Sequence, residues 1–110
     1  MSILIVDDEE RDRTWLKNLI TNNLSGELPL TEGQDGLQAV ELAAKHKPKL
    51  VFLDIKMPNL SGIKAAEQIL KQLPETGVIM LSNFSDEVYV RQLWKVVPPN
   101  GAFGYVLKSA

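Results

Sequence analysis

Four short apolar runs of this 110-residue chain each end directly on polar side chains. In chain order these side chains are Asp7 with Asp8, then Asp54, Ser82 and Lys108. Carboxylates about 5 Å apart repel one another by roughly 3 kcal/mol per pair at an effective dielectric constant near 20. If the fold gathers the three aspartates, a lysine offsets part of that repulsion and a divalent cation offsets more. Because this set offers carboxylate oxygens without His or Cys, the pattern favours Mg²⁺ or Mn²⁺ over zinc.

A metal held by carboxylates beside a lysine and a hydroxyl suits a phosphoryl group better than a carbonyl group. Phosphoryl transfer depends mainly on positioning the group and neutralising its charge. Asp54 is then the candidate nucleophile, which would form an aspartyl phosphate. Plainer readings exist, since Asp7 and Asp8 also suit the start of a helix, where the dipole favours negative charge. Their placement after an apolar run, matched by Asp54 after another, favours the site.

The apolar runs have the character of buried strands. Three of them are rich in β-branched or aromatic residues and lie near Gly or Pro. The runs are Ile3–Val6, Leu50–Leu53, Val78–Leu81 and Phe103–Leu107. A weaker strand is expected near Glu27–Glu32, where leucines alternate with polar residues.

Apolar residues at helical spacing lie between the strands. They form four stripes: Leu16, Leu19, Ile20 and Leu24; Leu37, Val40 and Ala44; Ile63, Ala66, Leu70 and Leu73; and Val90, Leu93, Trp94 and Val97. Pro48 and Pro74 are expected to end the second and third helices, and Ser61 to cap the third. Trp15 lies beside the first stripe, which predicts partial burial in the core.

Strands and helices thus alternate along the chain, which predicts an α/β fold with a doubly wound parallel sheet and helices on both faces. In such sheets functional groups gather at the carboxyl ends of the strands. The polar residues that follow the apolar runs would therefore meet at one edge. The length of 110 residues suits a single domain.

Composition narrows the function classes. The net charge of −2 argues against a broad basic face for nucleic acid. The absence of cysteine excludes disulfides and thiolate metal sites. No apolar run approaches the length of a membrane span, and the amino terminus lacks the cationic lead of a signal peptide. The expectation is a cytoplasmic domain that binds neither membranes nor nucleic acid directly.

Four segments together resemble a known family. "ILIVDDEE", "LVFLDIKMPNLSG", "VIMLS" and "GAFGYVLKSA" occur in the order typical of the receiver domains of two-component response regulators, which are CheY-like. The resemblance covers essentially all of residues 1–110. It implies a five-stranded flavodoxin-like sheet in the order 2-1-3-4-5 and a phosphorylation-dependent signalling switch in a phosphorelay.

The resemblance also implies a role for each matching residue. Asp54 would accept a phosphoryl group from a phosphohistidine on a sensor histidine kinase or phosphotransfer protein. Asp8 would bind Mg²⁺ directly and Asp7 through water. The backbone carbonyl of Lys56 would complete the protein ligands.

Three further residues would contact the phosphoryl group or respond to it. Lys108 would pair with the phosphoryl oxygens, Ser82 would hydrogen-bond them, and Tyr105 would swing inward in response. Receiver domains assist their own phosphorylation and dephosphorylation, so the expectation is a switch and not a metabolic enzyme.

The chain departs from the family pattern in three places. Ser109 follows the lysine where the family usually has proline. Residues 91–108 are longer than the family norm by about one helical turn. The chain stops at Ala110, where the last helix would begin, so either the natural protein continues or another surface, such as a second copy in a homodimer, covers the gap.

Two other functions stay open. A receiver-like interaction module would bind partners without taking phosphate. A Mg²⁺-dependent phosphohydrolase would also form an aspartyl phosphate, but that class usually carries a second aspartate two residues after the nucleophile as a general acid. Lys56 occupies that position here, which disfavours the hydrolase.

Overall fold

The computed structural model describes residues 2–23, 29–82, 95 and 103–107. The strands are β1 (Ile3–Val6), β2 (Leu30–Gly33), β3 (Leu50–Asp54), β4 (Gly77–Ser82) and β5 (Phe103–Leu107). The helices are α1 (Glu10–Asn23), α2 (Gly36–His46) and α3 (Gly62–Gln72). The fourth predicted helix and Lys108 lie outside the described residues.

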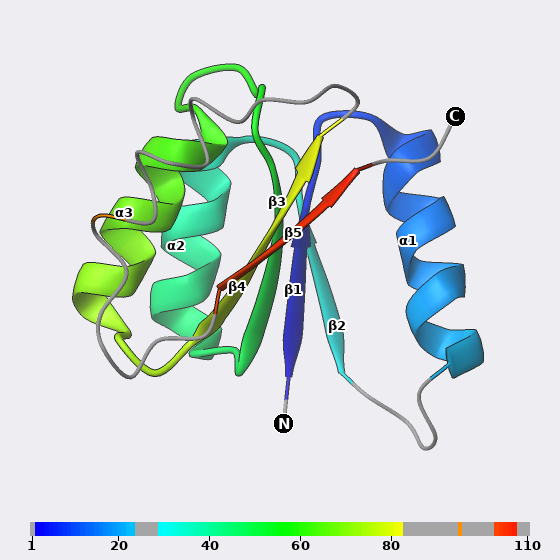
Figure 1. The fold of residues 1–110 in the computed structure, drawn as a ribbon, viewed down its shortest axis with the longest axis horizontal. Helices are drawn as coiled ribbons and strands as arrows, with labels where there is room; N and C mark the ends of the chain where they lie inside the picture. Colours follow the sequence, from blue (N-terminus) through cyan, green and yellow to red (C-terminus); the bar gives the residue numbers. More distant parts are fainter. Residues whose placement is uncertain (1, 24–28, 83–94, 96–102, 108–110) are drawn as a thin grey trace.

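The strands form one parallel sheet in the order β2-β1-β3-β4-β5 (Figure 1). This confirms the α/β fold and the predicted order. The four apolar runs match their strands to within one residue at either end. The weak strand lies at Leu30–Gly33, slightly later than the predicted Glu27–Glu32.

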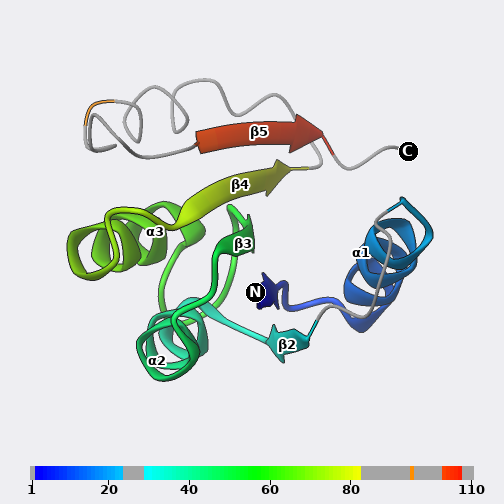
Figure 2. The same cartoon turned by 90° about the horizontal axis from the view of Figure 1, so that it is seen from below.

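Helices cover both faces of the sheet. In Figure 2, α1 lies on one side, while α2 and α3 lie on the other. One core cluster packs beneath α2 and α3 and includes Leu4, Val6, Val51, Leu53, Val78 and Met80 from the strands. The other packs beneath α1 and includes Ile3, Ile5 and Leu81, with Leu16 and Ile20 from the helix. Alternate strand residues therefore enter opposite cores, which is why the strands are apolar throughout.

Local signals set the ends of α3 as predicted. The hydroxyl of Ser61 accepts a hydrogen bond from the Lys64 backbone N–H at 3.3 Å, and the helix ends at Gln72, before Pro74. The predicted stripe of α3 is also correct, because Ile63, Ala66 and Leu70 are buried.

The predicted stripes of the other two helices need correction. On α1, Leu16 is buried, but Leu19 is 44% exposed and Trp15 is 40% exposed. On α2 the buried residues are Gly36, Ala39 and Ala43, while the predicted Leu37 is 51% exposed. Helical spacing fits two neighbouring stripes equally well, and in α2 the small alanines face the sheet and allow a close approach.

No helix in the described part of the chain combines the length and the apolar character needed to cross a bilayer.

Candidate metal and phosphoryl site

Three aspartates meet at the carboxyl edge of the sheet. Asp7 directly follows β1, and Asp54 is the last residue of the adjacent strand β3. Val6 lies opposite Leu53 in this pair, so the two aspartates come next to each other in register. Oxygen atoms of Asp7, Asp8 and Asp54 all lie within 4.8 Å of one another. The structure therefore brings together the three carboxylates that the sequence placed at strand ends.

Two of the three aspartates are buried, and the third is exposed. Asp7 is 1% exposed and Asp54 is 8% exposed, whereas Asp8 is exposed. At this separation the carboxylates repel by roughly 3 kcal/mol per pair at an effective dielectric constant near 20. Oxygen ligands in this number fit a hard divalent cation such as Mg²⁺ or Mn²⁺, and the open side at Asp8 gives access from solvent.

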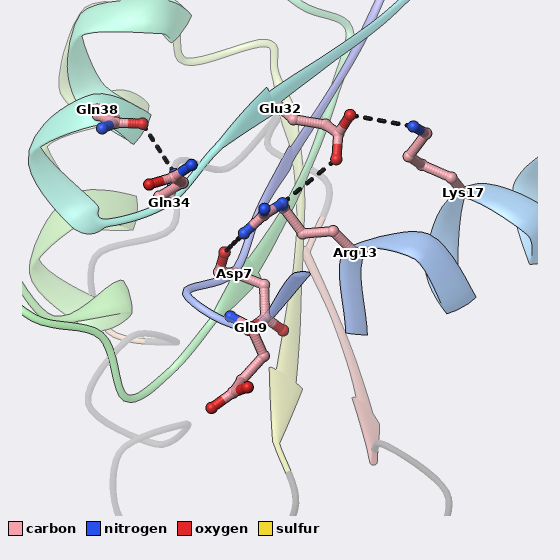
Figure 3. Close-up of polar contacts among 7 residues, drawn as sticks. All are labelled: Asp7, Glu9, Arg13, Lys17, Glu32, Gln34 and Gln38. Atoms are coloured by element: carbon pink, nitrogen blue, oxygen red, sulfur yellow. Dashed lines mark hydrogen bonds and ion pairs between the residues drawn. The ribbon is translucent and has the colours of Figure 1, made fainter. Parts of the chain in front are cut away.

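The turn that carries Asp7 and Asp8 is held by several hydrogen bonds. The Asp7 N–H donates to the Gly33 carbonyl of β2 at 3.2 Å. The Glu9 N–H donates to Asp7 Oδ1 at 2.9 Å. From α1, Arg13 Nη1 donates to the Asp7 carbonyl oxygen at 2.7 Å (Figure 3). The first strand, the second strand and the first helix thus all contribute to the shape of this turn.

On the other side of the site, Gly62 packs directly against the backbone of Asp54. A Cβ atom at position 62 would lie 1.9 Å from the Asp54 carbonyl oxygen. The Gly62 N–H donates to the Ile55 carbonyl at 2.8 Å, and the Ile55 N–H donates to the Leu81 carbonyl at 3.1 Å. Only glycine fits this close approach of α3 to the end of β3.

The loop between β3 and α3 is also anchored to the start of α2. Asn59, which has a left-handed backbone with φ of 69°, donates from Nδ2 to Asp35 Oδ2 at 2.9 Å. Asp35 caps α2 by accepting from the Gln38 N–H at 2.8 Å. A Cβ at Gly36 would lie 2.0 Å from the Leu60 carbonyl oxygen. This loop therefore has little freedom to shift relative to α2.

Hydrogen bonding changes the acidity of Asp35. The Gln38 backbone N–H is the larger cause and the Asn59 amide the second, and both stabilise the carboxylate form. Together they lower the pKa of Asp35 below its ordinary value.

Three of the other predicted site residues, Ser82, Tyr105 and Lys56, lie at or near the same edge. Ser82 is the last residue of β4 and pairs with Leu107 of β5. Tyr105 pairs with Met80 in the same ladder. Lys56 has an exposed side chain two residues after Asp54, and its carbonyl remains a predicted ligand. Lys108 lies outside the described residues.

Several residues that shape the site were not predicted from the sequence. They are Arg13, Asp35, Gly36, Asn59 and Gly62. Glycine is a poor helix former, so its presence at the starts of two predicted helices, at Gly36 and Gly62, could have indicated that the backbone is closely approached there. Arg13 gave no such signal, because an arginine near the start of a helix is usually solvated.

Comparison with known proteins places these features in a family. The family model described as response regulator receiver domain matches residues 3–110. The chain is 34% identical over 109 residues to the transcriptional regulatory protein DegU of Brevibacillus brevis, covering 99% of the chain and 44% of that protein. It is 33% identical over 111 residues to the oxygen regulatory protein NreC of Staphylococcus epidermidis, covering 100% of the chain and 49% of that protein. The chain thus spans about half the length of these curated relatives.

Solved structures agree with the family match. The response regulator domain of Thermotoga maritima CheB superposes with a TM-score of 0.79 at 33% identity, over 98% of this chain and 78% of that one. A two component transcriptional regulator AraC from Clostridium phytofermentans superposes with a TM-score of 0.77 at 36% identity, over 98% of this chain and 79% of that one. With its flavodoxin-like sheet and acidic edge, the chain belongs to the response regulator receiver domain family.

Proposed function

We propose that this receiver domain is a phosphorylation-dependent switch in which Asp54 accepts a phosphoryl group in a Mg²⁺-dependent reaction. The observation that carries the proposal is the approach of Asp54 to Asp7 and Asp8, with oxygens of all three within 4.8 Å at the carboxyl edge of the sheet. Receiver domains are signalling modules that interact with histidine kinases or phosphotransfer proteins. The proposed phosphodonor is accordingly a phosphohistidine on such a partner.

The cation would be held by the carboxylates of Asp7, Asp8 and Asp54 and by the backbone carbonyl of Lys56. When bound, Mg²⁺ supplies positive charge that offsets both the carboxylates and the phosphoryl oxygens. Asp8 is the exposed member of the cluster, which supports a direct ligand role. Buried Asp7 would act through a bound water.

In the reaction itself, a carboxylate oxygen of Asp54 attacks the phosphorus atom. A P–O bond forms, the P–N bond of the phosphohistidine breaks, and the imidazole nitrogen leaves with the electron pair of that bond. Lys108 would pair with the phosphoryl oxygens and offset their charge.

Phosphorylation would then favour one of two pre-existing surfaces of the domain. The Ser82 hydroxyl would donate a hydrogen bond to a phosphoryl oxygen, and Tyr105 would move inward in response. Adjacent registers support this coupling, since Leu81 pairs with Asp54 and Ser82 pairs with Leu107. A signal at β3 would thereby reach β5 through β4.

The cellular setting is also part of the proposal. We propose that residues 1–110 act as one receiver domain in the cytoplasm, without direct contact with nucleic acid or membrane. The net charge of −2 supports the absence of a nucleic-acid surface. A homodimer is a further proposed partner, which light scattering on the purified domain would detect.

The test is phosphorylation by a small phosphodonor. Wild type and Asp54→Asn are incubated with phosphoramidate, with Mg²⁺ or with a chelator, and their intact masses are compared. The expected result is that one alkali-labile phosphoryl group is added to wild type in the samples with Mg²⁺. No group is expected on wild type with chelator or on Asp54→Asn under either condition. A folded wild type that takes none would favour the interaction module, and fast sustained release of inorganic phosphate would favour the phosphohydrolase.

A further inference from the structure

Arg13 is a buried cation beside the proposed metal site. It lies near the start of α1 and is 8% exposed. Its guanidinium points toward Asp7, which directly follows β1, as Figure 3 shows. Burying a charged group is costly unless partners compensate for the lost water. The identity of those partners therefore indicates what this arginine does.

The first partner of Arg13 is the carbonyl oxygen of Asp7, which accepts from Nη1 at 2.7 Å. This carbonyl belongs to the peptide that joins Asp7 to Asp8, and both residues are proposed metal ligands. A hydrogen bond at this oxygen fixes the orientation of the peptide plane between them. Arg13 thus acts on the backbone that sets where the two carboxylates point.

The second partner is Glu32 on β2, whose Oε1 accepts from Arg13 Nε at 3.3 Å. Because the guanidinium is planar and its donors are fixed relative to one another, holding Nε also aims Nη1 at Asp7. Lys17 pairs with the other oxygen of Glu32 at 3.1 Å, from a more exposed position. In Figure 3, Lys17 approaches Glu32 from the side away from Asp7, so it is the matched control for charge.

We infer that Arg13 is a positioning residue of the metal site, which it holds in binding geometry through the Asp7 carbonyl while Glu32 orients it. This inference rests on the proposed function, because it requires that Asp7 and Asp8 bind Mg²⁺. Residues that orient metal ligands from outside the ligand set commonly change metal affinity by 10- to 100-fold when they are replaced.

A role of Arg13 through its charge and a role through positioning predict opposite changes in Mg²⁺ affinity when Arg13 is replaced, so one measurement distinguishes them. A guanidinium near the carboxylates repels an incoming dication, so removing its charge alone would tighten Mg²⁺ binding. Removing its hydrogen bond to the turn frees the peptide plane and would weaken Mg²⁺ binding. Arg13→Lys keeps the charge but cannot reproduce the two-armed geometry, and it separates the two effects further.

The experiment measures the Mg²⁺ dissociation constant of the full chain by isothermal titration calorimetry, with folding checked by circular dichroism. Arg13→Gln and Arg13→Lys are each expected to raise this constant by about 10-fold or more. Glu32→Gln should raise it less, because Arg13 keeps its bond to Asp7. Lys17→Gln should change it by no more than about twofold, since exposed ion pairs contribute little.

A second readout separates positioning from general damage to the fold. At saturating Mg²⁺, both Arg13 variants should recover the phosphorylation rate of wild type, because Arg13 does not contact the phosphoryl group. Wild-type or tighter Mg²⁺ affinity in folded Arg13→Gln would overturn the inference. If that variant fails to fold, wild-type or tighter Mg²⁺ affinity in folded Arg13→Lys and Glu32→Gln would overturn the inference instead. Absence of Mg²⁺ binding by wild type itself would overturn the proposed function together with this inference.

Discussion

At the scale of single residues, the geometry of the site depends on a glycine as well as on the three aspartates. Gly62 lacks a side chain where one would collide with the Asp54 carbonyl oxygen, since a Cβ there would lie only 1.9 Å from it. The contact is with backbone, which cannot swing aside as the end of a flexible side chain can. The geometry of the phosphoacceptor is therefore tied to a residue that carries no chemistry of its own.

Gly62→Ala should destabilise the domain and slow phosphorylation of Asp54. Alanine at a helical position would otherwise add up to about 1 kcal/mol of stability, so a loss of about 1–3 kcal/mol would reflect the collision. Urea unfolding measures the change in stability, and intact mass against time measures the rate.

Gly104→Ala is the matched control for this substitution. A Cβ there would meet the Ile79 side chain at 3.4 Å, which is an ordinary contact. This variant should keep its stability to within about 0.5 kcal/mol or gain slightly. Equal losses in the two variants would show that the contact with Asp54 has no special role.

At the scale of elements, parallel pairing explains why so much could be predicted from the sequence. The strands are apolar on both faces, which separates them clearly from the amphipathic helices, and their order places Asp7 beside Asp54. Helix faces were harder to predict, because the predicted stripe of α1 contained both Leu16, which is buried, and Leu19, which is 44% exposed. Only the packing of the helix against the sheet distinguishes the two residues. The role of Arg13 could not be predicted, because its two partners, the Asp7 carbonyl and the Glu32 carboxylate, lie beside it only in the folded chain.

The Asp35 cap links α2 to the loop that follows β3, and it should make stability depend on pH. Hydrogen bonds hold the folded pKa of Asp35 below its unfolded value. Its contribution is therefore present above the unfolded pKa, whose ordinary value is 3.8, and is lost as pH falls through the folded pKa.

Asp35→Asn removes this titration while leaving a side-chain oxygen to cap the helix. Wild type should be more stable than the variant at neutral pH, and the difference should shrink below about pH 4. Thermal unfolding of both proteins across this range measures it. A stability difference that stays constant or grows in acid would contradict the assignment.

At the scale of the whole molecule, repulsion among the clustered aspartates lowers the stability of the folded domain. The sheet brings Asp54 next to the consecutive residues Asp7 and Asp8, and each new pair of carboxylates costs roughly 3 kcal/mol at an effective dielectric constant near 20. The two core clusters, one beneath α1 and one beneath α2 and α3, must outweigh that cost. A bound cation would relieve it.

Asp54→Asn should therefore stabilise the domain in the presence of a chelator, by about 1–3 kcal/mol, because one charge leaves the cluster. Added Mg²⁺ should narrow the difference, since a ligand that binds the folded state stabilises wild type by mass action. Denaturant unfolding with and without Mg²⁺ provides the comparison. A variant that is less stable than wild type under both conditions would show that repulsion among the carboxylates is not significant.

The central claim is that Asp54 takes a phosphoryl group when the acidic cluster holds Mg²⁺. The most direct measurement reduces the phosphorylated protein with borohydride, which converts an acyl phosphate to an alcohol, and locates the product by peptide mass spectrometry. We predict homoserine at position 54 in samples that contained Mg²⁺ and unchanged aspartate in samples with chelator. Reduction at a different carboxylate, or at position 54 regardless of Mg²⁺, would contradict the claim.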